Sequence, residues 1–244
     1  MTYRYSRGWR LFTIVLLRPL LFLLLGRDWR GRHRIPASGG VIIAANHLSE
    51  ADPLALAHYV YKAGRFPVFL AKDALFRIPL AGRLLALIGQ IPVARATEDA
   101  SAAYERAREA LAAGECLVFY PEGTCTRDPR LWPMAAKTGA ARLALETGAP
   151  VIPVAHWGAQ DLLRYRSSAL RLFPRKTMKV IAGEPLDLTA YTGRPLDADT
   201  LRAASDDIMR AIAELLGGLR GQRPPSELYV HRREVRPDRR YEGA

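Results

Sequence analysis

The stretch that decides the fold runs from position 41 to position 60 and reads Val41-Ile-Ile-Ala-Ala45, Asn46-His47-Leu48-Ser49-Glu50-Ala51-Asp52-Pro53, Leu54-Ala-Leu-Ala-His-Tyr-Val60. Its five leading apolar residues are typical of a buried strand. Asp52-Pro53 predicts a helix start, because a carboxylate caps free N–H groups and proline at the first helical position loses no hydrogen bond. Gly64 predicts the end of that helix. Asn46 and His47 therefore occupy the turn between a strand and a helix, where α/β proteins present reactive groups.

His47 and Asp52 form a candidate catalytic pair. On one regular helix, side chains five residues apart point about 140° away from each other. The two can meet only if His47 precedes the helix and the chain turns back, as the strand–turn–helix prediction allows. A carboxylate beside an imidazole fixes its tautomer and makes the other ring nitrogen a better base. The alternative is that Asp52 only caps the helix and His47 is an ordinary loop histidine.

Composition limits the class of protein. The 244 residues suffice for one sizeable α/β domain, and the net charge of +12 implies an anionic partner: nucleic acid, a membrane surface or a phosphorylated substrate. The sequence contains no Gly-x-Ser-x-Gly elbow, no phosphate loop of the Gly-x4-Gly-Lys type and no dinucleotide fingerprint. Cys116 and Cys125 lack the spacing of a metal site and the density of a disulfide scaffold, which is consistent with a reducing compartment.

Residues 1–34 predict a membrane anchor. Between Leu11 and Leu25 lie 15 largely apolar residues, interrupted by Arg18-Pro19. A membrane-spanning helix needs about 20 apolar residues, so we expect a kinked or paired amphipathic anchor lying in one leaflet. A buried core helix and a single true span are the alternatives. The arginines expected to face anionic head groups are Arg4, Arg7, Arg10, Arg27, Arg30, Arg32 and Arg34.

The remaining pattern alternates strands with helices. We expect strands at 67–71, around 91–94, at 116–120, 150–155 and 177–182, and helices at 72–87 (in two pieces, divided by Pro79), 98–113, 137–148 and 199–219. The prolines at 150 and 153 suggest that the strand at 150–155 lies at a sheet edge. Residues 220–244 hold seven arginines and four acids and read as a basic tail, either solvated or in contact with anionic lipid.

A second group of candidate residues follows two strand ends. Arg95 ends the segment Gly89-Gln-Ile-Pro-Val-Ala-Arg95, and a guanidinium fork matches phosphate oxygens. After the strand at 116–120, main-chain N–H groups, the Thr124 and Thr126 hydroxyls and Arg127 form a candidate phosphate cradle. Glu122 either accepts a substrate hydroxyl or structures this loop, and Lys137 adds charge. The alternatives are that Arg95 is an ordinary surface arginine and that the loop after the strand at 116–120 is a plain turn.

Four segments together resemble the motifs of the glycerolipid acyltransferases, which include 1-acylglycerol-3-phosphate acyltransferase. These segments are Asn46-His47-x4-Asp52, Gly89-x-Ile-Pro-Val-x-Arg95, Tyr120-Pro-Glu-Gly-Thr-Cys-Thr126 and Val151-Ile-Pro-Val154. The third motif is usually Phe-Pro-Glu-Gly-Thr-Arg-Ser. Cys125 therefore replaces a common arginine, and Arg127 is the candidate to supply the missing cation. A nucleophilic Cys125 and a second base at His156 are further alternatives.

The resemblance implies an α/β fold, with a mixed sheet flanked by helices and preceded by a hydrophobic helical anchor. It implies an anchor at 1–34, an acyltransferase domain at 35–219 and the tail at 220–244. It also implies that His47 and Asp52 are catalytic, without a metal or resident cofactor. The residues implied to bind substrate are Asn46, Arg95, Glu122, Gly123, Thr124, Thr126, Arg127 and Lys137.

The implied reaction moves an acyl chain from acyl-CoA or acyl carrier protein to a glycerol phosphate hydroxyl, with the sn-2 hydroxyl of lysophosphatidic acid as the leading acceptor. Glycerol 3-phosphate or a glycolipid are alternative acceptors. The implied location is the cytoplasmic face of the inner or plasma membrane. A non-catalytic basic lipid-binding protein is the alternative of another class. Nucleic acid is not expected, because the arginines cluster at the chain ends without interleaved aromatic residues.

Overall fold

The computed structural model describes residues 3–93, 97–167 and 169–231. Their strands are β1 Leu25–Arg30, β2 Val41–Ala45, β3 Pro67–Lys72, β4 Ile91–Val93, β5 Cys116–Phe119, β6 Val151–Trp157 and β7 Lys176–Ala182. They form a seven-stranded sheet in the order β1-β7-β6-β2-β5-β3-β4. Neighbouring strands are parallel except β6 and β7, which are antiparallel. The mixed α/β sheet expected from the sequence is therefore confirmed.

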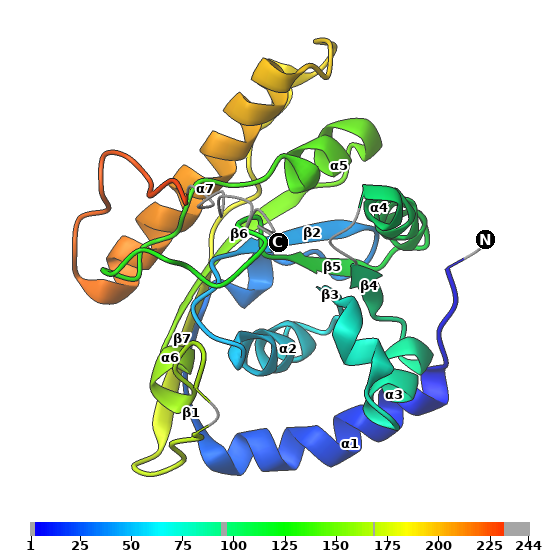
Figure 1. Ribbon diagram of the computed structural model, residues 1–244, viewed down its shortest axis with the longest axis vertical. Coiled ribbons are helices and arrows are strands. Elements are labelled where there is room, and N and C mark those ends of the chain that lie inside the picture. The colour runs from blue at the N-terminus through cyan, green and yellow to red at the C-terminus, as the bar shows by residue number, and fades with distance from the viewer. Residues whose placement is uncertain (1–2, 94–96, 168, 232–244) are drawn as a thin grey trace, which may run out of the picture.

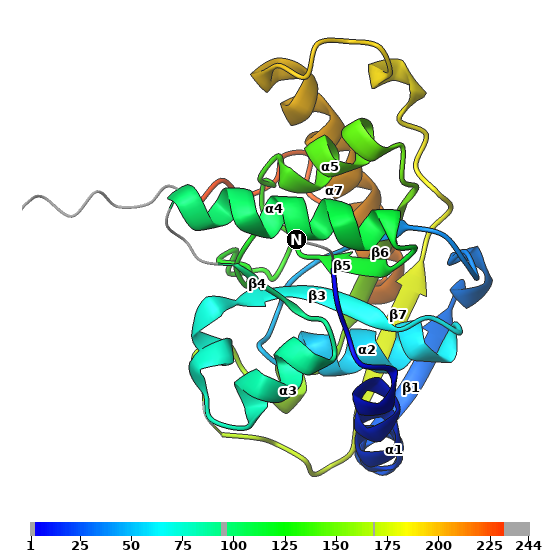
Figure 2. The ribbon, with the colours of Figure 1, turned by 90° about the vertical axis from the view of Figure 1, so that its right-hand side faces the viewer.

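Helices cover both faces of this sheet. The α-helices are α1 Arg7–Leu24, α2 Asp52–Lys62, α3 Ala81–Leu87, α4 Thr97–Ala112, α5 Gly139–Thr147, α6 Ala159–Leu162 and α7 Ala198–Arg220, with 3-10 turns η1 Arg32–Arg34, η2 Asp73–Arg77 and η3 Thr189–Tyr191. Helices α4, α5 and α7 lie over one face, and α2 lies against the other with α1 beyond it (Figure 1). Figure 2 shows the same layers from the side.

The central strand β2 is buried on both faces. Val41, Ile43 and Ala45 pack in the apolar cluster that contains α2 side chains. Ile42 and Ala44 pack in the cluster formed with α4, α5 and α7. Successive side chains of a strand alternate between faces, so a continuous apolar run suits a strand covered on both sides. This burial fixes the end of β2, and with it the position of residues 46 and 47.

The N-terminal segment differs from the expectation. Helix α1 is a single helix that contains Pro19, rather than a pair of helices. Residues 25–30 lie within the segment expected as anchor, yet they form β1, which pairs in parallel with β7. Gly26 permits this pairing, because a Cβ there would lie 2.8 Å from Thr177 Oγ1. The short, arginine-rich stretch gave no strand pattern, and its pairing with a distant partner determines its structure.

The expectation of an edge strand at 150–155 is wrong, because β6 lies between β2 and β7. The main-chain carbonyl of Pro153 accepts a hydrogen bond from Gly183 N at 2.8 Å, on the β7 side. The N–H and C=O of one strand residue point to the same side, so the missing N–H of Pro153 also faces β7. The ladder between β6 and β2 is therefore intact, and proline is tolerated in an internal strand.

Candidate active site

Strand register brings three strand ends together. Ala44 pairs with Phe119 of β5, and Ala45 pairs with Val154 of β6. The residues just beyond β2 therefore lie between the segment that follows β5 and the last part of β6. The sheet thus assembles into one site two of the segments that the sequence analysis singled out, 46–52 and 120–127.

His47 and Asp52 are in contact. The Asp52 carboxylate is fully buried, and its Oδ2 lies 2.8 Å from His47 Nδ1. The same oxygen accepts the main-chain N–H groups of Leu48 at 2.6 Å and Ser49 at 2.9 Å. A carboxylate only accepts hydrogen bonds, so Nδ1 carries the proton and Nε2 keeps its lone pair. The predicted pairing is confirmed. The prediction that the Asp52 carboxylate caps α2 is wrong: Asp52 is the first residue of the helix after the N-cap Ala51, and its carboxylate turns back to residues 47–49 instead of bonding helix N–H groups.

Both the main chain and the ring of His47 are held by neighbouring residues. Its main-chain N–H donates to Glu122 Oε1 at 2.8 Å, and its carbonyl accepts from Thr126 N at 2.7 Å. Its ring stacks on Tyr120, with centroids 4.1 Å apart and planes inclined by 15°. Its side chain is 17% exposed, enough to reach a ligand. The imidazole is thus pre-oriented, as a positioned base requires.

Two residues expected to bind substrate use their side-chain polar atoms in hydrogen bonds within the protein. Glu122 Oε2 accepts Met134 N at 2.9 Å, so with the bond from His47 both carboxylate oxygens are used. The Thr126 hydroxyl donates to Trp132 O at 2.6 Å and accepts Asp128 N at 3.2 Å. Both side chains are buried. They shape the loop, which is the second of the two roles considered for Glu122.

Asn46 has a similar structural role. Its Nδ2 donates to His156 O at 3.1 Å, and its Oδ1 accepts His156 N at 2.9 Å. The His156 ring Nε2 lies 2.6 Å from Asn46 O, a carbonyl that requires Nε2 to be the donor. Both ends of the Asn46 side-chain amide therefore tie the end of β2 to β6, and the His156 ring, only 1% exposed, holds the Asn46 carbonyl.

Glu122 leads to a prediction about pH. Burial raises the pKa of Glu122 from 4.5 to about 8, against the lowering by its two main-chain donors. Above pH 4.5 the folded chain keeps a proton on Glu122 that the unfolded chain releases. The stability of the folded state relative to the unfolded state therefore falls as pH rises from about 4.5 through 8. We expect the unfolding free energy of the wild type, relative to Glu122→Gln, to fall by on the order of 3 kcal/mol between pH 5 and pH 8.

Urea unfolding at pH 5, 6.5 and 8 measures this difference. The variant cannot titrate at position 122, so it serves as the reference in which all other groups cancel. A difference that stays constant or grows with pH would show that Glu122 is ionised in the folded protein throughout this range.

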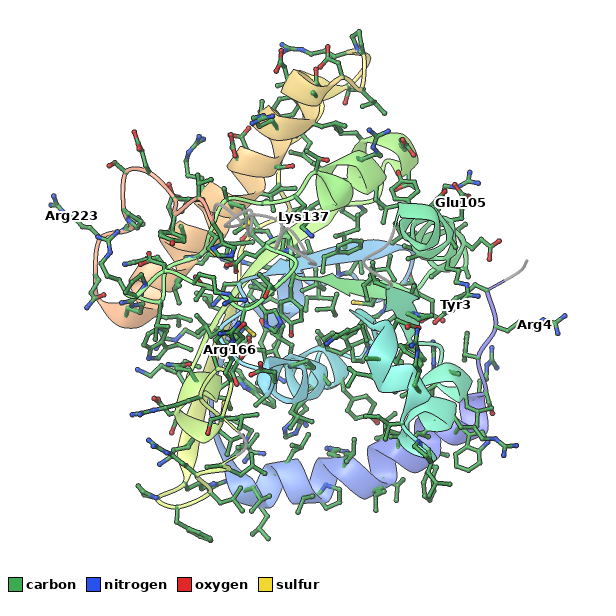
Figure 3. All side chains as sticks on the ribbon, viewed as in Figure 1. Tyr3, Arg4, Glu105, Lys137, Arg166 and Arg223 are labelled. Atoms are coloured by element: carbon green, nitrogen blue, oxygen red, sulfur yellow. The ribbon has the colours of Figure 1, made fainter. Side chains whose placement is uncertain are left out.

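Other predicted residues remain available to a ligand. In the described part of the chain, the Thr124 hydroxyl makes no hydrogen bond, and Arg127 and Lys137 form no ion pair with a carboxylate. Arg127 Nε is buried without a partner. Lys137, labelled in Figure 3, lies against Gly123, where an added Cβ would be 3.0 Å from Lys137 Cε. Arg95 lies outside the described residues.

The sequence analysis missed an arginine and a tyrosine near Arg127. The Arg127 guanidinium lies 4.8 Å from the Tyr165 ring centroid, and the Arg166 guanidinium lies 5.5 Å from the same centroid. Arg166 is labelled in Figure 3. Both residues come from the loop after α6, which carries no motif. Only the interleaved arginine and tyrosine at 164–166 could have drawn attention to it.

Cys125 lies beside the candidate base. Its Sγ is 3.6 Å from His47 Nε2 and 3.7 Å from Nδ1. Burial, followed by the nearby Asp52, raises the pKa of the Cys125 thiol well above its usual range. The thiolate is the nucleophilic form of cysteine. The raised pKa therefore favours the neutral thiol over the nucleophilic thiolate at this position.

An imidazole oriented by a buried carboxylate, at the carboxyl ends of parallel strands and near unpaired cations, defines an acid–base site suited to an anionic substrate. Residues 27–157, slightly more than half of the chain, match the family model described as Acyltransferase. The chain belongs to this family.

Individual relatives agree with this assignment. A 1-acyl-sn-glycerol-3-phosphate acyltransferase of Borreliella burgdorferi is 35% identical over 127 residues, 51% of this chain and 48% of the relative, so the match spans about half of that protein. An enzyme of the same name from Bacillus subtilis is 29% identical over 202 residues, 82% of this chain and 92% of the relative. The crystal structure of PlsC, the corresponding acyltransferase of Thermotoga maritima, has the same fold, with a TM-score of 0.61 and 23% identity over 84% of this chain and 80% of that one.

Proposed function

We propose that this protein transfers a fatty acyl chain from an acyl thioester to the sn-2 hydroxyl of lysophosphatidic acid, which gives phosphatidic acid. The observation that carries the proposal is the His47–Asp52 pair, inside the segment that matches the family model. The names of the relatives support the acceptor. The donor is proposed as acyl-CoA or acyl carrier protein, the two common thioesters of acyl chains.

The proposed chemistry needs one base and no enzyme nucleophile. His47 Nε2 takes the proton from the acceptor hydroxyl as its oxygen attacks the thioester carbonyl. The tetrahedral intermediate collapses with cleavage of the carbon–sulfur bond, and the imidazolium returns the proton to the leaving thiolate. Asp52 stabilises the imidazolium through Nδ1. A positioned general base contributes about 10²–10⁴-fold to such a reaction.

The cations of the site are proposed to hold the acceptor phosphate. Thr124 and Arg127 belong to the loop that clamps His47, Lys137 lies against Gly123 of the same loop, and Arg95 is proposed to complete the set. Holding the phosphate aims the hydroxyl at Nε2 and turns a bimolecular encounter into a positioned one. Gly123 lets the Lys137 side chain pack against this loop, because an added Cβ would lie 3.0 Å from Lys137 Cε, and its φ of +70° also favours glycine.

Arg127→Gln is expected to raise the KM for lysophosphatidic acid by about 10-fold or more with a smaller change in kcat, because a charge-assisted hydrogen bond to phosphate contributes about 1.5–3 kcal/mol. Arg130→Gln is the matched control, since Arg130 is exposed and already paired with Asp128. Steady-state kinetics with varied acceptor measures both variants. Equal KM values in the wild type and Arg127→Gln would remove Arg127 from the phosphate site.

Helix α1 is proposed to lie in one leaflet of a membrane. It exposes large apolar side chains, including Val15 at 65% and Leu23 at 72%, and the others are Trp9, Leu11, Phe12, Leu16, Leu20 and Phe22. A patch of this kind marks an interaction surface. Leu80 is 86% exposed and Phe173 is 83% exposed, and the loop of Phe173 is tied to the end of α1 by Arg175, which bonds Phe22 O and Leu25 O.

The arginines of this segment do not all face head groups as expected. Arg10 is buried in an ion pair with Glu115 at 2.9 Å, Arg30 pairs with Asp28 at 3.0 Å, and Arg34 pairs with Glu184 at 2.6 Å. Within the described residues, no helix has both the length and the hydrophobicity to cross a bilayer. The proposed attachment therefore depends on the apolar face of α1 and on the arginines that remain unpaired.

Leu16→Glu combined with Leu23→Glu is expected to lower binding to anionic vesicles by at least about 10-fold. Each change removes methylene groups that the proposed attachment buries in the leaflet, and adds a negative charge to the apolar face. Val230→Glu is the control, since Val230 is 64% exposed but lies near the other end of the chain. Vesicle sedimentation measures the bound fraction. Unchanged binding by the double variant would remove α1 from the membrane surface.

The proposed location is the cytoplasmic face of the inner or plasma membrane, which suits two free cysteines. The purified protein should be incubated with a labelled acyl thioester and a panel of acceptors: lysophosphatidic acid, glycerol 3-phosphate and a neutral glycolipid. We expect labelled phosphatidic acid as the main product. Acylation of no acceptor with either thioester would favour a non-catalytic lipid-binding protein.

A further inference from the structure

A cationic pocket lies away from the candidate active site. It occupies about 280 Å³ between α1, β1, η1 and α2. Figure 2 shows α1, α2 and β1 meeting at one side of the molecule. Drug-sized ligands usually occupy about 300–1,000 Å³, so this pocket suits a small group such as a phosphate. Its four cations are Arg18, Arg27, Arg32 and Lys62.

Regular geometry explains why these cations converge. Arg27 and Trp29 are two apart on β1 and therefore share one face, whereas Asp28 and Arg30 share the other and pair with each other. Arg18 and Phe22 on α1, and likewise His58 and Lys62 on α2, are four apart and lie on one face of their helix. The only acid of residues 1–34 is thus directed away from the pocket.

The pocket's positive charge is not neutralised by the protein. Within the described residues, none of its four cations forms an ion pair with a carboxylate. Arg27 rests 3.7 Å from the Phe22 ring centroid, and Arg32 donates to the Lys62 carbonyl at 3.4 Å. Burial, together with Arg27, Arg18 and Lys62, lowers the pKa of His58 to about 4. The pocket therefore carries a net positive field with a neutral imidazole inside it.

Trp29 lines the pocket beside these cations, and its indole nitrogen is buried. Its indole lines the pocket and meets His58 edge to face, with centroids 4.8 Å apart. Its Nε1–H is buried and has no hydrogen-bond partner in the part of the chain that the structure describes. An indole N–H only donates, and a buried donor without an acceptor costs free energy. The four cations and the Trp29 N–H are thus donors without a carboxylate partner among the described residues, and the neutral His58 ring has one N–H donor beside its acceptor nitrogen.

We propose that this pocket binds a phosphate group, presented either by an anionic phospholipid or by a soluble phosphate. Guanidinium and ammonium groups are the usual protein partners of phosphate oxygens. The pocket adjoins α1 and lies at the end of α2 opposite Asp52, about 15 Å along that helix. It is therefore separate from the candidate acceptor site, and the inference does not depend on the proposed acyl transfer.

The test is an NMR titration of the His58 ring in the full-length protein, with inorganic phosphate in one arm and dihexanoyl phosphatidic acid, below its micelle concentration, in the other. Binding is expected to shift the His58 signals with a single dissociation constant. It is also expected to raise the His58 pKa by about one unit or more, because an anion offsets the charges of Arg18, Arg27 and Lys62, which lower that pKa. A response to both probes identifies a phosphate site open to solvent, and a response to the lipid alone identifies a head-group site.

Arg18→Gln with Lys62→Gln is the pocket variant. Both side chains are exposed and neither has an ion pair among the described residues, so the fold should be retained. Arg4→Gln with Arg7→Gln removes the same charge from exposed positions outside the pocket. We expect binding to weaken at least 10-fold in the pocket variant and less than 2-fold in the control. No His58 response to either probe, or equal weakening in both variants, would overturn the proposal.

Discussion

His47→Ala is expected to lower kcat for acyl transfer by about 10²–10⁴-fold, the usual contribution of a positioned general base. An alcohol has a pKa far above neutrality, so its attack on a thioester is slow unless a base removes the proton. The substitution takes away only the imidazole. The hydrogen bonds that fix this turn use the main-chain N–H and carbonyl of residue 47, which bond Glu122 and Thr126, so they remain in the variant.

Two controls separate chemistry from folding. His33→Ala removes an exposed histidine on η1 and should leave kcat unchanged. Vesicle binding of His47→Ala should match the wild type. Its thermal unfolding should stay cooperative with a lower midpoint, because the ring's hydrogen bond to Asp52 and its stacking on Tyr120 are lost. Near-normal acyl transfer by a folded His47→Ala protein would exclude His47 as the base.

Asp52→Asn is expected to lower kcat by about 10²-fold or more with little effect on stability. All three hydrogen bonds to this carboxylate, from His47 Nδ1, Leu48 N and Ser49 N, end on Oδ2, while Oδ1 is buried without a partner. An asparagine can place its single carbonyl oxygen at that position and keep the three bonds. It cannot supply the negative charge that stabilises the imidazolium formed as His47 takes the proton.

Asp161→Asn is the matched control, because Asp161 is exposed on α6. Single-turnover kinetics, together with the thermal midpoint, distinguishes the two roles of Asp52. If kcat stays within about threefold of the wild type, Asp52 serves only to hold the turn at residues 47–49. If the protein unfolds, the three hydrogen bonds need the charge as well as the geometry.

Local patterns were sufficient for the centre of the fold. The apolar run at 41–45, the helix start at Asp52-Pro53 and the spacing of His47 from Asp52 each act over a few residues, so the sequence alone indicates them, although the Asp52 carboxylate bonds the preceding turn and does not cap the helix. The catalytic geometry follows from a turn that only five residues define. The resemblance to the acyltransferases then drew attention to the loop at 120–127, although Arg95 lies outside the described residues.

Long-range pairing accounts for what the sequence could not indicate. Asn46 reaches His156 across 110 positions, and Glu122 reaches back to His47 across 75, so side chains that look like substrate ligands are used within the protein. β1 becomes a strand only because β7 lies beside it. Pro153 fits an internal strand because its missing donor faces β7, and no pattern in the sequence shows which side that is.

The central claim is that His47 activates the acceptor hydroxyl for direct attack on the thioester. Rapid mixing of stoichiometric protein with an acyl thioester, with and without lysophosphatidic acid, tests it through the release of free thiol. We predict one thiol per phosphatidic acid formed, no release without acceptor, and none in His47→Ala. A burst of one thiol per protein in the absence of acceptor, with the acyl chain recovered on Cys125, would contradict this account.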